Sequence, residues 1–168
     1  MQTVDFLSGQ MSNQMVSIQL IYTVNMENSF SDVCPIARSL ECAGDAWSIM
    51  ILRDANLGLT RFDQFQKNLN IAPTMLTRRL ATLTQEGLLK KQQYSQRPPR
   101  DEYVLTDAGR DFLPVLFMLG AWGRKHRGKK KLIKFVDAET GKEIRPVVID
   151  SSNGTEVGTR PIRTIFPK

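Results

Sequence analysis

The fold is decided by the stretch PTMLTRRL, residues 73–80, together with the loop QRPPR, residues 96–100. Pro73 suits the first turn of a helix, because its missing N–H would have no intrahelical partner there. Helical periodicity then places Leu76, Leu80 and Leu83 on one face, with Thr74 and Arg78 opposite. We therefore expect one face of this helix to be buried and the other to present small polar groups and a guanidinium.

The segments on either side predict the neighbours of this helix. Residues 61–68 suggest a shorter helix capped by Thr60, with Phe62 and Phe65 on its buried face. Ile71 should dip into the core from the intervening turn. Strands are expected over 88–94 and 102–105, flanking the basic loop. This order of helix, turn, helix and basic hairpin predicts a winged helix-turn-helix.

Helices are also expected before and after this unit. Apolar residues recur at helical spacing from Pro35 to Ala43 and from Ala46 to Asp54. A long helix should run from Asp107 to about Arg124, capped by Thr106 and kinked by Pro114. Its apolar surface exceeds what one small domain covers, so we expect it to form a dimer interface. The residues expected there are Phe112, Leu116, Leu119 and Trp122.

The predicted fold class is α+β and mainly α: a winged helix-turn-helix domain, a long C-terminal dimerisation helix and a small β-hairpin tail. We expect an N-terminal extension over 1–30, partly flexible, the domain over 31–127, and a basic linker with the tail over 128–168. Within the tail, 136–144 and 149–157 are similar at an offset of thirteen residues, which predicts two small hairpins. The tail should pack on the domain or on a second subunit.

Charge is concentrated on the elements expected to bind DNA. The chain has 168 residues, 41% of them hydrophobic, and a formal net charge of +6. Residues 61–134 hold sixteen basic and six acidic side chains, whereas residues 1–60 hold two and six. Phosphate binding with counterion release requires such a local excess of cations. Apolar runs fall short of a membrane span. With only two cysteines the chain has no disulfide scaffold, so a reduced, cytoplasmic location is expected.

The composition gives little support for an enzyme or a metalloprotein. Two cysteines cannot form a disulfide scaffold, and the single histidine, His126, lies among cations that would oppose a metal ion. We find no paired carboxylates, nucleophile–base pair or glycine-rich phosphate loop. We therefore expect no catalytic residues, no metal and no cofactor.

Taken together, the motifs resemble the HxlR-type winged helix-turn-helix regulators, relatives of the MarR group. The resemblance covers about Ser31 to Arg127 and depends on the order and spacing of short pieces. It implies a homodimer that binds a pseudopalindromic operator as a transcription regulator, often of genes that respond to oxidants, electrophiles or other small molecules. The matching pieces are CPI (34–36), GDAW (44–47), ILR (51–53), RFD (61–63) with Phe65, LTRRL (76–80), EGL (86–88), YVLTDAG (103–109) and WG (122–123).

In such a dimer the helix that begins at Pro73 should enter the major groove. Arg78 is the first candidate for reading base edges, most naturally guanine. Thr74 and Thr77 could contact phosphate or a thymine methyl group, and Arg79 could bind phosphate or an acidic neighbour. At the wing, the residues expected to contact phosphate or the minor groove are Arg97 and Arg100; of Lys90 and Lys91, which alternate on a strand, one can face DNA.

Two ways of sensing an effector are open. Position and resemblance make Cys34 a candidate redox sensor near a helix N-terminus, with a small buried hydrophobe as the alternative. Cys42 is interpreted as core; on one continuous helix the two would lie about 12 Å apart, too far for an internal disulfide. Alternatively, a small molecule could enter an apolar pocket at the dimer junction. That pocket would be lined by Trp47, Met50, Phe112 and Phe117, which could equally be core.

A different class of function also remains open. Winged helices can dock on other proteins without binding DNA. The outward-facing Arg and Thr side chains argue against this alternative, because docking faces usually expose aromatic or leucine side chains.

Overall fold

The computed structural model describes residues 30–128, 131–165 and 167. Two compact units are present, one formed by the described residues up to Glu41 with Pro167 and the other by Cys42–Ile165. The first contains helix α2, Phe30–Val33, and most of α3, Pro35–Ala43. The expected extension over residues 1–30 lies outside the described residues except for Phe30.

Helix α4, Ala46–Asn56, is the first complete helix of the larger unit. Asp45 caps it, since its carboxylate accepts the N–H groups of Trp47 at 3.0 Å and Ser48 at 3.1 Å. The helix continues two residues beyond the predicted end at Asp54. Gly58 then turns the chain with φ +93°, a conformation that side chains disfavour.

Helices α5, Phe62–Leu69, and α6, Pro73–Gln85, form the helix-turn-helix. The predicted start of α6 at Pro73 is confirmed. The predicted cap at Thr60 is wrong, because the N-cap position belongs to Arg61. Instead, the Gln64 side-chain carbonyl accepts both the Thr60 and the Arg61 N–H groups, at 3.1 and 3.0 Å. The start of α5 is therefore stabilised by an amide inside the helix that accepts the N–H groups preceding it, and not by a cap hydroxyl.

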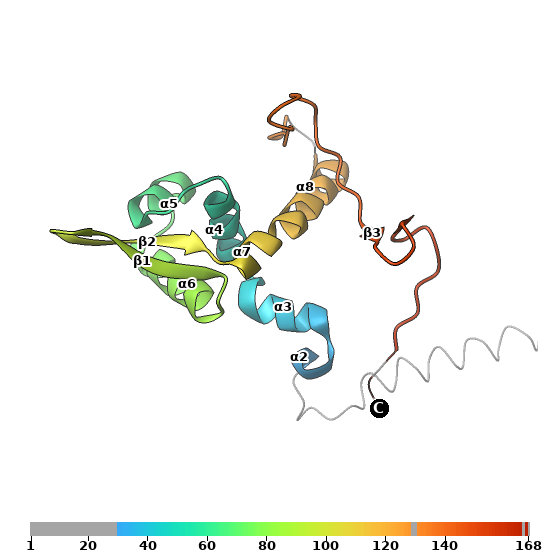
Figure 1. Cartoon of the computed structure of the whole chain (residues 1–168), viewed down its shortest axis with the longest axis horizontal. Coiled ribbons are helices and arrows are strands. Elements are labelled where there is room, and N and C mark those ends of the chain that lie inside the picture. Colours follow the sequence, from blue (N-terminus) through green and yellow to red (C-terminus); the bar gives the residue numbers. More distant parts are fainter. Residues whose placement is uncertain (1–29, 129–130, 166, 168) are drawn as a thin grey trace, which may run out of the picture. The chain divides into compact units, whose positions relative to one another are not determined.

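The wing is an antiparallel pair of strands, β1, Leu89–Gln96, and β2, Pro99–Leu105. Both strands are longer than predicted, so Arg97 and Pro98 alone form the turn. Pro99 can open β2 because the first residue of a strand need not donate to the ladder. The register runs from Leu89 opposite Leu105 to Gln96 opposite Pro99, with an irregularity between Gln93 and Ser95. The hairpin projects beyond α5 and α6 (Figure 1).

Two helices follow the wing, α7, Asp107–Asp111, and α8, Leu113–Arg127. One long helix kinked by Pro114 was predicted. The interruption is present beside that proline, but it divides the segment into two helices instead of bending one. Pro114 lies in the first turn of α8, where its missing N–H costs no hydrogen bond, and the chain breaks at Phe112. The predicted cap at Thr106 is confirmed: its hydroxyl accepts the Gly109 N–H at 3.1 Å.

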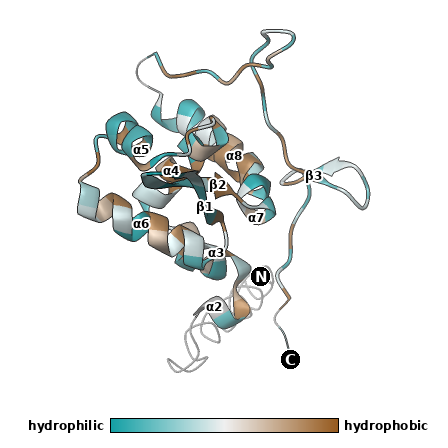
Figure 2. Cartoon of the chain, turned by 60° about the vertical axis from the view of Figure 1, so that its left-hand side comes forward, coloured by the Kyte–Doolittle hydropathy of each residue, from teal (hydrophilic) through white to brown (hydrophobic). Residues whose placement is uncertain are grey.

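The hydrophobic core lies between α4, α5, α6 and the base of the wing. Phe65, Leu76, Leu80 and Leu83 have no exposed surface, and Ile71 is 4% exposed, as predicted for the turn. Hydrophobic residues also run along α8 (Figure 2). Within the described residues, no helix is long and apolar enough to cross a membrane.

The tail contains the two predicted turns. The first is closed by a bridge between Val136 and Glu143, and the second pairs β3, Ile149–Asp150, with β4, Thr155–Glu156. Equivalent hydrogen bonds occur at an offset of thirteen residues. The Gly141 N–H donates to the Asp137 carbonyl and that of Gly154 to the Asp150 carbonyl, both at 2.8 Å. The internal repeat is therefore a repeat of structure.

Candidate nucleic-acid interface

Helix α6 has the two faces that its periodicity predicts. Leu76, Leu80 and Leu83 are fully buried, whereas Thr74 and Arg78 are exposed. Because the leucines pack into the core, the rotation of the helix about its axis is set. The polar face is thereby held at the surface of the domain.

Arg78 is free to bind a ligand. Within the part of the chain that the structure describes, no side-chain hydrogen bond or ion pair to its guanidinium is found. The Thr82 hydroxyl donates to the Arg78 backbone carbonyl at 3.1 Å, so it does not occupy the side chain. Thr77 is also exposed, but its hydroxyl donates to the Pro73 carbonyl at 2.9 Å. Its oxygen and methyl group remain available for contacts.

Arg79 has an acidic partner. Its Nε lies 3.1 Å from Asp45 Oδ1, and its side chain is 24% exposed. Burial alone would raise the pKa of Asp45. That pKa is nevertheless below its ordinary value, because the carboxylate is stabilised by the Ser48 hydroxyl and N–H, the charge of Arg79 and the Trp47 N–H. Arg79 therefore joins α6 to the capped start of α4, and of the two adjacent arginines Arg78 is the more accessible.

A buried carboxylate connects α4 to α5. Asp54 has no exposed surface. Its Oδ1 accepts hydrogen bonds from Nε of Arg53 at 2.8 Å and from Nη2 of Arg53 at 2.6 Å. The other oxygen, Oδ2, accepts the Asn68 side-chain amide at 2.7 Å. A buried carboxylate with these three partners fixes the end of α4 against the end of α5, immediately before the turn that leads to α6.

The wing carries cations at its tip and a neutralised pair on its stem. Arg97 and Arg100 are exposed. Lys91 lies 2.7 Å from Asp101, whose hydrogen bond and charge raise the pKa of Lys91. Lys90 is exposed and has no such pair among the described residues. Of the two adjacent lysines, Lys90 is thus the one whose charge no neighbouring carboxylate in the described residues neutralises.

The wing is anchored to the helices at its base. The Tyr103 N–H donates to the Thr60 carbonyl at 2.7 Å, and the Thr106 hydroxyl to the Gly87 carbonyl at 2.5 Å. The guanidinium of Arg61 also lies over the Tyr94 ring, 4.8 Å from its centre. These contacts hold the hairpin in a defined position relative to α5 and α6.

Several of these positioning residues were missed by the sequence analysis. The pairs Asp54–Asn68 and Asp45–Arg79 join residues distant in the chain, and no spacing rule reveals them. The cap formed by Asp45 is local, and an Asp directly before an apolar helix is a signal that could have indicated it. A signal did exist for Asp54, because a carboxylate inside the apolar run of α4 must either be exposed or be paired. Arg61 was noted as part of a motif without a role.

Of the four residues expected at a dimer interface, two belong to or pack against the core of their own domain and two are exposed. Leu116 is 8% exposed and belongs to the core of its own domain, and Phe112 packs against that core. Leu119 and Trp122 are 49% and 53% exposed. The difference follows from the angle at which α8 leaves the domain, since one side of the helix meets α4 and the other does not.

The two cysteines occupy different environments. Cys34 lies between α2 and α3, and its carbonyl accepts the Arg38 N–H at 3.0 Å, so it precedes the first turn of α3. Neither cysteine forms a disulfide within the described residues, and both are half-buried. Cys42 packs against the core and its sulfur lies 3.5 Å from Glu86 Oε2. Because Cys34 lies outside α3, the two cysteines do not share one continuous helix.

The residues proposed for an apolar pocket serve other contacts. Phe117 meets Phe135 of the tail edge to face, with ring centres 4.9 Å apart. The Met50 sulfur accepts a hydrogen bond from Arg53 at 3.6 Å. Phe112 packs against the core, and Trp47 is 36% exposed. These contacts favour structural roles for at least three of the four residues.

Comparison with protein families identifies this architecture. The profile of the HxlR-like helix-turn-helix matches residues 42–131, which include α4 to α8. The chain belongs to the HxlR-like helix-turn-helix family. The HTH-type transcriptional regulator Rv3095 of Mycobacterium tuberculosis is 36% identical over 129 residues, 76% of this chain and 82% of that protein. YdeP of Bacillus subtilis is 34% identical over 97 residues, 57% of this chain and 76% of that protein.

Solved structures agree with this assignment. The transcription factor PA1607 is 32% identical with a TM-score of 0.72, over 79% of this HxlR-like chain and 94% of that one. The redox regulator HypR in its reduced form is 30% identical with a TM-score of 0.53, over 56% and 94% respectively. The protein is a helix-turn-helix transcriptional regulator with an α+β winged fold, and it is not an enzyme.

Proposed function

We propose that the protein binds a specific double-stranded DNA operator as a homodimer. The observation that carries the proposal is the exposed, uncommitted guanidinium of Arg78 on a helix whose opposite face is fully buried. A helix in the major groove needs a rigid support and a side chain that can reach base edges. Family membership supports the same function.

The roles divide between bases and phosphates. Arg78 reads a base edge, most naturally guanine, while Thr74 and Thr77 contact phosphate or a thymine methyl group. Arg97 and Arg100 hold phosphate or the neighbouring minor groove. Arg79 acts mainly by fixing α6 to the start of α4. Its contact with phosphate would compete with Asp45.

The homodimer is proposed because one copy of α6 can contact only part of an operator. A single α6 covers a short half-site, and two copies related by a twofold axis place their helices in successive major grooves, roughly 34 Å apart. Leu119 and Trp122 are the exposed apolar residues of α8 that we assign to this interface. Binding to chromosomal DNA would place the protein in the cytoplasm.

The decisive experiment compares Arg78→Ala with Arg97→Ala. We expect Arg78→Ala to cost about 1–3 kcal/mol on the selected operator and to relax sequence preference, whereas Arg97→Ala weakens all duplexes alike. Binding would be measured on an operator selected from random duplexes and on random DNA. Arg145→Ala, which removes an exposed tail cation, is the matched control. Equal losses on both DNAs for Arg78→Ala would contradict base reading.

A protein-docking role is the competing function. It is tested by titrating salt during binding to a random duplex, because phosphate contacts release counterions and give a steep decline of affinity. A docking module should show weak binding and little dependence on salt.

We also propose that the regulator responds to oxidants through Cys34 or to a small-molecule ligand. The similarity to HypR and the place of Cys34 before the first turn of α3 support the thiol route. Diamide treatment, followed by non-reducing electrophoresis and a DNA-shift assay, should change binding by the native chain and by Cys42→Ser. Cys34→Ser should be insensitive. Unchanged binding by the native chain would remove the thiol route.

A further inference from the structure

The tail carries two copies of one hairpin, and the first copy packs on α8 of its own chain. Phe135 lies edge to face against Phe117, and a methyl group added at Gly120 would come within 3.1 Å of the Phe135 ring. Glu143 completes the contact, with Oε1 2.5 Å from Nη1 of Arg124. The first hairpin therefore uses one apolar side chain and one carboxylate to hold a cation-bearing helix.

The second hairpin repeats this arrangement. Val148 takes the place of Phe135 and Glu156 that of Glu143. Hydrogen bonds agree as well, since the Ile144 N–H donates to the Phe135 carbonyl at 2.9 Å and that of Val157 to the Val148 carbonyl at 2.8 Å. Yet Val148 and Val157 are 46% and 48% exposed, and within the described residues no cation pairs with Glu156.

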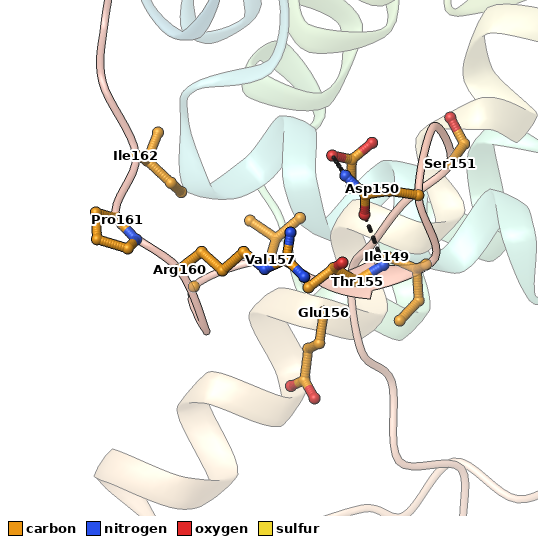
Figure 3. Close-up of a pocket in the computed structure, with 11 residues that line it drawn as sticks. Ile149, Asp150, Ser151, Thr155, Glu156, Val157, Arg160, Pro161 and Ile162 are labelled. Atoms are coloured by element: carbon orange, nitrogen blue, oxygen red, sulfur yellow. Dashed lines mark hydrogen bonds between the residues drawn. The ribbon is translucent and has the colours of Figure 1, made fainter.

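The second hairpin also lines a surface cavity. The hairpin and the segment that follows it border an open surface cavity of about 550 Å³, lined in part by Ile149, Val157 and Ile162. Figure 3 shows these side chains around the hollow, with the Asp150 turn on one side and the segment from Arg160 to Ile162 on the other. This surface is large enough to receive a bulky side chain and carries two carboxylates, Asp150 and Glu156, beside one cation.

A surface of matching character lies on α8, on the side not used by the first hairpin. Val115, Leu119 and Trp122 follow one line along the helix and are each about half exposed. Arg127 lies over the Trp122 ring, 5.9 Å from its centre, and Lys125 is exposed nearby. This stripe therefore offers apolar side chains followed by cations, the same combination that Phe117 and Arg124 offer to the first hairpin.

We propose that the second tail hairpin of one subunit docks on the Val115–Leu119–Trp122 stripe of α8 in a second copy of this chain. The inference rests on the proposed homodimer and names the element that covers its exposed α8 residues. A second copy fits better than an unrelated protein, because α8 is already the helix to which the homologous hairpin binds. Every chain offers one hairpin and one stripe, so reciprocal exchange closes at two subunits.

Charge exchange tests the pairing without disturbing the core. Glu156→Arg and Arg127→Glu should each raise the dissociation constant of the dimer about five- to tenfold, and the double variant should return to within about threefold of the native chain. Sedimentation equilibrium of the full chain measures this constant. Glu139→Arg, which makes the same charge change at the exposed turn of the first hairpin, is the matched control and should have no effect. Singles without effect, or a double variant no better than the singles, would overturn the pairing.

Cysteine pairing shows which chain receives the hairpin. Chains with Leu119→Cys and chains with Val157→Cys, both also carrying Cys34→Ser and Cys42→Ser, would be mixed and mildly oxidised. A disulfide between the two different chains supports exchange. A bond that forms only when one chain carries both cysteines shows docking on its own helix and overturns the proposal, as does no bond in either arrangement.

The outcome also separates this inference from the proposed function. If the native chain sediments as a monomer at micromolar concentration, both the proposed homodimer and the proposed hairpin exchange are overturned. If the native chain is a dimer that binds operator DNA, but the charge variants dimerise normally and no cross-link forms, only the hairpin exchange is overturned.

Discussion

The winged domain and the tail are stabilised in different ways. Every buried hydrophobic residue of the described chain lies between Ala43 and Leu116, whereas in the tail Val147, Ile162 and Ile165 remain 57–79% exposed. The domain is held by a shared core, so a change at one residue is felt throughout. The tail is held by turns that satisfy their own hydrogen bonds, with the contacts of Phe135 and Glu143 to α8 in addition. A DNA-reading surface needs the first kind of stability, because its side chains must stay in place while they meet the bases.

The tail turns show how local this second kind of stability is. Asp137 accepts the Thr140 N–H and hydroxyl, both at 2.7 Å, and Asp150 accepts those of Ser152 at 2.9 and 2.7 Å. In each turn the hydroxyl and backbone N–H hold the carboxyl pKa below its ordinary value. All partners lie within three residues, so neither turn needs the core.

The largest expected effect is the loss of the buried carboxylate of the domain. Asp54→Ala should lower the free energy of unfolding by about 3–5 kcal/mol, because it leaves Arg53 and Asn68 without their buried partner. Urea unfolding followed by circular dichroism measures the change. Asp101→Ala, which removes an exposed partner of Lys91, is the control and should cost less than about 1 kcal/mol. Similar losses for both variants would contradict a special role of burial.

The next prediction concerns the joint between the wing and α7. A methyl group at Gly109 would lie 2.1 Å from the Leu88 carbonyl oxygen, so Gly109→Ala should cost about 1–3 kcal/mol or more. Gly123→Ala in α8 meets nothing within 4 Å and should instead add up to about 1 kcal/mol, through its better helix propensity. The opposite signs would be read from the urea midpoints. A neutral Gly109→Ala would mean that the joint is loose.

A smaller, pH-dependent effect is expected at Asp45. Asp45→Ala should cost about 1 kcal/mol near neutral pH, because it removes the cap of α4 and the partner of Arg79. Since the pKa of Asp45 is lowered by folding, its contribution is present above the unfolded value, about 4, and disappears as the pH falls through the folded value. Unfolding of native and Asp45→Asn chains between pH 7 and pH 3 checks this. The Asn variant should lose less stability on acidification, and parallel profiles would refute the assignment.

The smallest effect on overall stability is expected in the tail. Gly154 has φ +71°, so Gly154→Ala should strain its turn by about 1–2 kcal/mol without moving the urea midpoint of the domain. Amide hydrogen exchange at Val157 should accelerate about tenfold, since the protection of this N–H comes from the hairpin alone. Ser151→Ala leaves the backbone conformation unchanged and serves as the control. A shift of the domain midpoint with Gly154→Ala would show that the tail and the domain unfold together.

The sequence predicted helix α6 more accurately than the elements around it. The faces of α6, its start at Pro73 and the buried Ile71 are confirmed, because helical periodicity and proline chemistry are local. The cap of α5, the length of the wing strands and the continuity of the last helix were predicted wrongly. In each case the chain can adopt several local conformations of similar free energy. At the start of α5, for example, Gln64 and not Thr60 supplies the side-chain acceptor. The DNA contacts and the redox role of Cys34 stay predictions.

The amino-acid sequence by itself determined which side of α6 is apolar, which turns repeat in the tail and where the positive charge is concentrated. These properties depend on neighbours only a few residues apart. The tertiary structure alone decided that Arg79 meets Asp45, that Asp54 joins Arg53 to Asn68, and that Leu116 is buried while Leu119 and Trp122 are exposed. Such contacts depend on the angles at which whole helices pack, and those angles result from the fit of all core side chains together.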